Sequence, residues 1–150
     1  MKVVDEQRKE KEIATKRKNH TFNASLTEEN AYHMLHFLYP HLVRQHKSEE
    51  YPFMCDFYDP YSRAYIECNF SWTHGGHWFD ENDLADMQRL KFMKSKQSKY
   101  YNNAIETWTV RDIKKRKFAE ENNLKYIVFW TEKEVRKYVL DELNKIASKM

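Results

Sequence analysis

Two acidic residues interrupt apolar segments of this sequence, and they are the first residues that could do chemistry. Asp56 lies in "FMCDFY" and Glu67 lies in "AYIECNF". A carboxylate inside a protein is costly to desolvate unless it is paired or holds a metal. If the two segments are neighbouring strands, Asp56 and Glu67 can converge into the oxygen cradle that Mg²⁺ prefers. Because strand side chains alternate, a second interpretation stays open, in which Asp56 points to the polar face.

The stretch "WTHGGHWFDENDLAD" contains two histidines and both glycines of the chain. Imidazole titrates near neutral pH, which suits His74 to act as a general base. Gly75 and Gly76 would let this loop approach a phosphate closely, because glycine tolerates backbone conformations that other residues avoid. His77 and Asp80 are further candidates in the same loop. We interpret "ENDLAD" as the cap and first turn of the next helix.

A third acidic residue, Asp112, lies on the apolar side of a predicted helix. Trp108 precedes it by four residues and Ala119 follows it by seven, which places Asp112 on the stripe that faces the core. A carboxylate that faces inward from a helix is a candidate for the same site. In the simpler alternative, Asp112 forms an ion pair with Lys115 or Arg116 one turn further along.

A zinc site is the other chemistry that the two histidines suggest. Zinc in a structural site usually has four Cys or His ligands. Only Cys55 and Cys68 could join the histidines, and both lie inside apolar, strand-like segments without C-x-x-C spacing. We therefore expect no structural zinc, and we interpret the cysteines as small buried thiols that suit a reducing compartment.

The helices and strands that must position these residues are predicted in the order α-β-β-β-α-α-β-α. The predicted segments are a helix over 25–40, strands over 42–47, 51–60 and 63–72, helices over 83–96 and 100–122, a strand over 124–130 and a helix over 131–150. The turn signal Asp59-Pro60 joins the second and third strands into an antiparallel hairpin. This order predicts an α/β fold with a mixed β-sheet flanked by helices.

Length and composition indicate one domain with a polar extension. The chain has 150 residues with 15% aromatic content, which suffices for a sizeable core. Residues 1–24 are polar and of mixed charge, and we interpret them as a basic N-terminal arm ahead of a single domain over 25–150. The sequence contains no apolar run that could span a bilayer and no secretory signal, so we expect a cytoplasmic protein with no membrane partner.

The net charge of +3 hides an asymmetry along the chain. Residues 86–150 carry 16 Lys and Arg against 9 Asp and Glu, whereas residues 1–85 carry 10 against 14. This pattern favours a polyanion-facing surface beside a carboxylate-bearing site, although Lys-rich helix faces are also often simply solvated. The candidates for contacts with a nucleic-acid backbone are Lys94, Lys96, Lys99, Lys114, Lys115, Arg116 and Lys117.

Taken in order, these residues resemble the very short patch repair endonucleases and the related phage homing endonucleases with an EDxHD active site. The resemblance covers roughly Thr27 to Trp130. Its motifs are a helix Glu (Glu29, with Glu28 as the neighbour that could replace it), a strand Asp before an aromatic residue (Asp56), the tripeptide Thr73-His74-Gly75, and a helix Asp (Asp112) before a strand that ends in Trp130.

The resemblance implies a restriction-endonuclease-like core and Mg²⁺- or Mn²⁺-dependent hydrolysis of double-stranded DNA in a phage or its prokaryotic host cell. It implies that Glu29, Asp56, His74 and Asp112 are catalytic, and that Asp56 and the Thr73 carbonyl bind the metal. Glu67 lies outside the family positions and is an additional candidate ligand. A double-strand cut by so small a nuclease would often need two active sites, and hence a homodimer.

The chain departs from the repair branch of this family, because it lacks the cysteines that hold a structural zinc there. The resemblance is therefore closer to the homing-type branch. The alternative function is a catalytically silent nucleic-acid-binding module on the same fold, for which the basic second half would suffice. Trp72 and Trp78 could wedge between bases or pack in the core.

Overall fold

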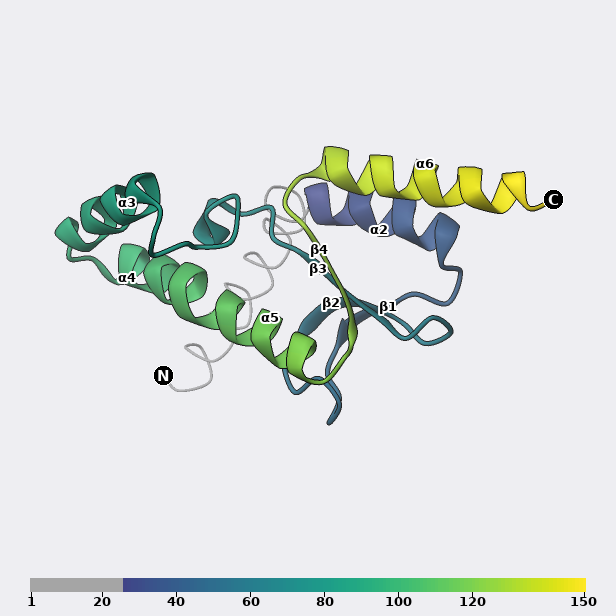
Figure 1. Cartoon of the computed structure of the whole chain (residues 1–150), viewed down its shortest axis with the longest axis horizontal. Coiled ribbons are helices and arrows are strands. Elements are labelled where there is room, and N and C mark those ends of the chain that lie inside the picture. The colour runs from purple at the N-terminus through teal and green to yellow at the C-terminus, as the bar shows by residue number, and fades with distance from the viewer. Residues whose placement is uncertain (1–25) are drawn as a thin grey trace, which may run out of the picture.

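The computed structural model describes residues 26–150, which fold around one four-stranded mixed sheet (Figure 1). The strands are β1 (Val43–His46), β2 (Cys55–Asp59), β3 (Ala64–Cys68) and β4 (Lys125–Phe129), in that spatial order. The first three strands pair antiparallel, and β4 lies parallel to β3. The predicted α/β class, hairpin and mixed sheet are confirmed. The predicted N-terminal arm over 1–24 lies outside the described residues.

Helices cover both faces of the sheet. Helices α2 (Leu26–Leu38) and α6 (Glu132–Ser148) lie side by side on one face, and α5 (Asp112–Glu121) lies on the other (Figure 1). Neighbouring strand residues show the division: Ile66 packs in the core with α2 and α6, whereas Tyr65 packs in a cluster with Phe118 of α5. Burial of each such large apolar side chain contributes about 1.5–3 kcal/mol.

Helices α3 (Leu84–Ser95) and α4 (Lys99–Glu106) project beyond the sheet (Figure 1). Of the residues in α3, Leu90 and Met93 are buried, but Leu84 and Phe92 are exposed. The buried face of α3 is therefore narrow, because α3 packs against α4 rather than on the sheet. None of the described helices is long and apolar enough to cross a membrane.

The observed element order differs from the predicted order in two places. A short 3₁₀ turn, η1 (Trp72–His74), lies between β3 and α3. A π-helical segment, η2 (Thr107–Arg111), joins α4 to α5 inside the predicted helix over 100–122. Such π-bulges are frequent at functional sites, because they rotate the side chains that follow them. Here η2 contains Trp108 and ends directly before Asp112.

Candidate active site

Asp56 and Glu67 form a carboxylate pair on β2 and β3. The pairing of Phe57 with Ile66 continues to place Asp56 opposite Glu67. The Asp56 backbone N–H donates to Glu67 Oε1 at 3.0 Å, and the Cys68 backbone N–H donates to Asp56 Oδ2 at 2.8 Å. Burial, together with the negative charge of Glu67, raises the pKa of Asp56 to about 7. The pair is therefore difficult to ionise fully without a nearby cation.

Lys115 of α5 supplies one positive charge to this pair. Its Nζ donates to Glu67 Oε2 at 2.9 Å and to the Met54 carbonyl at 3.4 Å. Burial works against the charge on Lys115, but attraction by Glu67 and Asp56 outweighs it and raises the pKa of the lysine. The structure thus places Lys115 among the acidic residues, not on the surface where a contact to a nucleic-acid backbone was expected.

His74 and Asp112 form a hydrogen-bonded pair beside the carboxylates. His74 ends η1, and its Nδ1 lies 2.7 Å from Oδ2 of Asp112, which is only 4% exposed. An ionised carboxylate can only accept a hydrogen bond, so this contact assigns the proton to Nδ1 of the neutral imidazole. Nε2 of His74 is then left with a lone pair that can accept a proton. Asp112 therefore pairs with His74. The simpler alternative, an ion pair of Asp112 with Lys115 or Arg116, is not what the structure shows.

These groups open on one cavity of about 340 Å³. It lies where the start of α2, the ends of β2 and β3, η1 and α5 meet. The residues that line it are Thr27, Glu28, Asp56, Glu67, Cys68, Phe70, Ser71, His74 and Lys115. The cavity therefore brings together Asp56, Glu67 and His74, with Asp112 behind the histidine, and it adds Lys115.

The acidic residue that α2 presents to this cavity is Glu28 and not Glu29. Glu29 accepts a hydrogen bond from Arg44 at 2.6 Å, which lowers the pKa of the glutamate. Consecutive residues of a helix point about 100° apart, so only one of the two can face the cavity. The structure therefore brings Glu28, the alternative that the sequence offers, to the cavity, and it does not bring Glu29 there.

The loop that carries His74 is held against η2 by close packing. Gly75 has φ of 77°, and a Cβ atom there would lie 2.2 Å from Trp108 Nε1. Trp108 Nε1 donates to the His77 carbonyl at 3.0 Å, and Arg89 Nη1 donates to the Gly75 carbonyl at 2.7 Å. Gly75 is therefore needed for close approach of the loop to Trp108, which differs from its expected approach to a phosphate.

The second histidine lies outside the cavity, in a pair of its own. His77 Nε2 lies 2.7 Å from Oδ1 of Asp86, a 3% exposed residue in the first turn of α3. Asp86 also accepts the backbone N–H of Asp80 at 3.0 Å, and Asp80 in turn caps a local turn at Asn82. None of these residues lines the cavity. The network fixes the loop, and no pattern in the sequence singled out Asp86.

Thr73 also lies outside the set of residues that line the cavity. Its hydroxyl donates to Ser71 Oγ at 3.1 Å, and Ser71 is among the residues that line the cavity. The metal-binding role of the Thr73 carbonyl stays a prediction. Over the range 26–150, no group of three or more His, Cys, Asp and Glu side chains is arranged to hold a metal ion. Any metal at Asp56 and Glu67 would therefore have few protein ligands.

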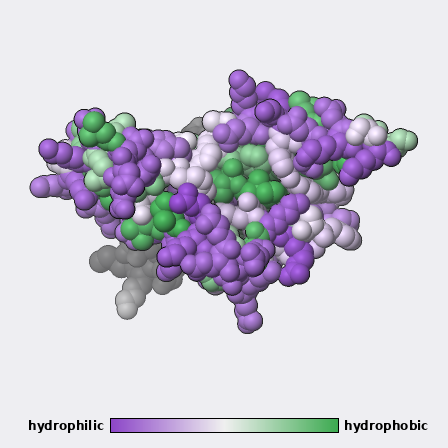
Figure 2. Space-filling view, in the orientation of Figure 1, coloured by the Kyte–Doolittle hydropathy of each residue, from purple (hydrophilic) through white to green (hydrophobic). Residues whose placement is uncertain are grey.

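Apart from Lys115, two of the predicted basic residues pack over aromatic rings and the other four are exposed. Arg116 packs over the Trp78 ring at 4.5 Å, and Lys96 packs over the Phe92 ring at 4.6 Å. Figure 2 shows hydrophilic side chains gathered over α5 and apolar ones at the centre of the same face. The remaining candidates for a basic surface, all exposed, are Lys94, Lys99, Lys114 and Lys117.

Comparison with protein-family models, with curated proteins and with solved structures finds no match to this chain. The chemistry of the cavity is therefore inferred from the residues that form it. The cavity combines a proton acceptor held by a buried carboxylate, three further carboxylates (Glu28, Asp56 and Glu67) and one lysine. Such a set can activate a water molecule and stabilise negative charge that develops on a substrate.

Proposed function

We propose that this chain is a Mg²⁺- or Mn²⁺-dependent DNA endonuclease with a restriction-endonuclease-like core of the phage homing type. The observation that carries the proposal is that His74, held by Asp112 at 2.7 Å, opens on the same cavity as Asp56, Glu67 and Lys115. Hydrolysis of a phosphodiester needs a positioned water, a proton acceptor and positive charge near the phosphate. The cavity contains a group suited to each task.

Asp56 and Glu67 are the residues that would hold the metal. Mg²⁺ binds through one or two carboxylates and keeps several of its waters, which fits a site without a third clustered ligand. The raised pKa of Asp56 supports this assignment, because a divalent cation would relieve the repulsion between the two carboxylates. When bound, the metal would polarise the phosphate and acidify a water molecule.

His74 and Lys115 carry the chain's own part of the proposed mechanism. Nε2 of His74 accepts the proton of the attacking water, and Asp112 stabilises the imidazolium that results. Lys115, held at the cavity by Glu67 at 2.9 Å, places a positive charge where the phosphate oxygens would lie. Each role depends on one side chain at a defined position in the cavity, so substitution of His74 or Lys115 tests it.

The proposed substrate is double-stranded DNA, contacted through its phosphates. The exposed lysines of α3, α4 and α5 and the hydrophilic surface over α5 (Figure 2) support such contacts. The same basic surface supports the second candidate, a silent nucleic-acid-binding module. That module would need the lysines but not the His74–Asp112 pair.

Incubation of supercoiled plasmid with the full chain separates the two candidates. The nuclease proposal predicts nicked or linear DNA in Mg²⁺ or Mn²⁺ and intact plasmid in EDTA. A gel-shift series at increasing salt measures binding in parallel. Salt-dependent binding without cleavage in either metal would contradict the nuclease and favour the binding module.

A further inference from the structure

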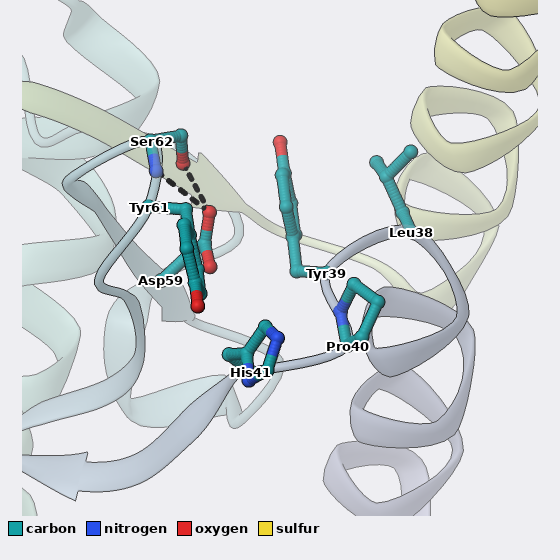
Figure 3. Close-up of a pocket in the computed structure, with 7 residues that line it drawn as sticks. All are labelled: Leu38, Tyr39, Pro40, His41, Asp59, Tyr61 and Ser62. Carbon is teal, nitrogen blue, oxygen red and sulfur yellow. Dashed lines mark hydrogen bonds between the residues drawn. The ribbon is translucent and has the colours of Figure 1, made fainter.

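A second cavity, of about 530 Å³, lies at the opposite end of the β2–β3 hairpin from Asp56 and Glu67 (Figure 3). One wall is the segment that follows α2, and the other is the turn between β2 and β3. The residues that line the cavity are Leu38, Tyr39, Pro40, His41, Asp59, Tyr61 and Ser62. No Lys or Arg is among them, so this cavity differs from the basic surface described above.

Aromatic rings form the sides of this cavity. Figure 3 shows Tyr39 and Tyr61 on opposite sides of it, with His41 close to Tyr61; the ring centroids of that pair are 4.5 Å apart. Tyr39 is fixed by a 2.6 Å hydrogen bond between its hydroxyl and that of Tyr138. Tyr61 is 76% exposed, so it contributes little to the core. The arrangement offers ring faces on which a ligand could rest.

A buried carboxylate completes the cavity. Asp59 is 3% exposed, and the backbone N–H and the hydroxyl of Ser62 donate to its Oδ2 at 2.9 and 2.6 Å. Among residues 26–150, no hydrogen bond reaches Asp59 Oδ1. None of the fully buried side-chain oxygens among the described residues lacks a hydrogen-bond partner, so Oδ1 of Asp59 is accessible from the cavity. A positively charged N–H donor in the cavity could therefore reach this oxygen and form a charge-assisted hydrogen bond.

We propose that this cavity binds an organic ammonium group. The faces of Tyr39 and Tyr61 would attract the cation through their ring quadrupoles, and Asp59 Oδ1 would accept an N–H or lie against a methylated nitrogen. The group belongs either to a lysine side chain of another protein or to a free alkylamine. The carboxylate of Asp59 and the absence of a lining Lys or Arg disfavour an anion in this cavity. This site is independent of the proposed nuclease activity, and neither depends on the other.

The test uses charged probes and an uncharged mimic on the full chain. Choline, spermidine and an acetyl-lysine amide with a free side-chain amine are each titrated and followed by amide NMR shifts at residues 38–41 and 59–62. Dimethylbutanol, the uncharged carbon isostere of choline, is the matched control ligand. The proposal predicts amide shifts with the ammonium probes and none with the isostere. Tighter binding of the lysine amide would indicate a lysine side chain as the ligand, and tighter binding of spermidine would indicate a free alkylamine. Equal binding of choline and its isostere overturns it, as does failure of all three charged probes.

Substitution of the exposed tyrosine then places the ligand. Tyr61→Leu should weaken binding by about three- to thirtyfold, the effect of losing one cation–π face. Tyr100→Leu removes a tyrosine of α4 that is 63% exposed and lies outside the cavity, and it should leave the affinity unchanged. Because Tyr61 is on the surface, its loss should not unfold the chain. Unchanged affinity in Tyr61→Leu would overturn the proposal.

Discussion

His74 Nδ1 and Asp112 Oδ2 lie 2.7 Å apart although 38 positions separate the two residues in the chain. The contact exists because Gly75 lets the His74 loop pack onto Trp108, one turn before Asp112. The proton acceptor of the proposed mechanism is therefore assembled by the fold. Substitutions of the residues that form or support this contact should therefore change the cleavage rate and the stability of the chain to different degrees.

Asp112→Asn should reduce the rate of DNA cleavage by about 10²–10⁴-fold while the chain stays folded. The amide nitrogen can donate to Nδ1 of His74, which would move the proton to Nε2 and leave no acceptor for water. Single-turnover cleavage and circular dichroism measure the two effects. Glu106→Gln, an exposed acidic residue of the same helical run, is the matched control. A rate for Asp112→Asn equal to that of the control would exclude the proposed role.

Asp56→Asn should stabilise the metal-free protein at pH 8 by about 2 kcal/mol. Because the pKa of Asp56 is raised from 3.8 to about 7, the folded state holds its proton over that range while the unfolded chain has lost it. This carboxyl therefore removes stability as the pH rises through that interval. The gain from the substitution should grow from pH 4 to pH 7 and then level off, as measured by urea unfolding. Mg²⁺ should stabilise the wild type at pH 8 but not Asp56→Asn, and equal metal effects on both would argue against Asp56 as a ligand.

Lys115→Met should abolish cleavage and destabilise the chain by about 3 kcal/mol, because Glu67 would keep a buried charge without its cation. Adding Glu67→Gln should restore much of the stability but not the activity. Thermal unfolding and plasmid cleavage give the two readouts. Lys117→Met, on the exposed side of the same helix, is the control. It should leave thermal stability and cleavage largely unchanged and cause only a modest loss of DNA affinity. Full activity in the single Lys115 variant would remove this residue from the mechanism.

The two glycines offer a matched pair of substitutions. Both have positive φ, 77° for Gly75 and 79° for Gly76, so alanine strains the backbone at either position by about 1 kcal/mol. Only at Gly75 would the new methyl group collide with Trp108, whereas at Gly76 it would meet open space. Gly75→Ala should therefore lose cleavage and several degrees of Tm, and Gly76→Ala should keep most of both. Equal behaviour of the two variants would mean that packing on Trp108 does not position His74.

Much of the fold follows from the sequence, because it depends on local patterns. Apolar strand segments and the turn signal Asp59-Pro60 predicted the hairpin, and the order of helices and strands predicted a mixed sheet. The proximity of Asp56 and Glu67 followed from that hairpin. Strand alternation alone could not decide which face Asp56 uses, but the observed register places it opposite Glu67 on the side of α5.

The parts of the site that the sequence did not predict depend on packing between distant segments. The rotation of α2 presents Glu28 to the cavity in place of Glu29, and that rotation depends on the packing of Ala31 and Leu35 in the core and on the contact of Glu29 with Arg44. The turn of α5 that brings Lys115 to Glu67 depends on the π-helical segment before it, for which the sequence shows no clear signal. The rotation of a helix about its axis depends on its contacts with distant segments, and the pattern of residues within one segment does not determine it.

Cleavage of supercoiled plasmid by the wild type and by His74→Ala, with DNA binding measured on the same samples, tests the central claim most directly. Loss of His74 leaves the buried Asp112 carboxylate without its partner, so the variant should lose some stability, and circular dichroism at the assay temperature checks that it is folded. Its DNA affinity should be unchanged, because the proposed phosphate contacts come from exposed lysines. The proposal predicts Mg²⁺-dependent cleavage by the wild type and a loss of cleavage of at least about 10²-fold in the variant. Cleavage by His74→Ala at the wild-type rate would contradict it.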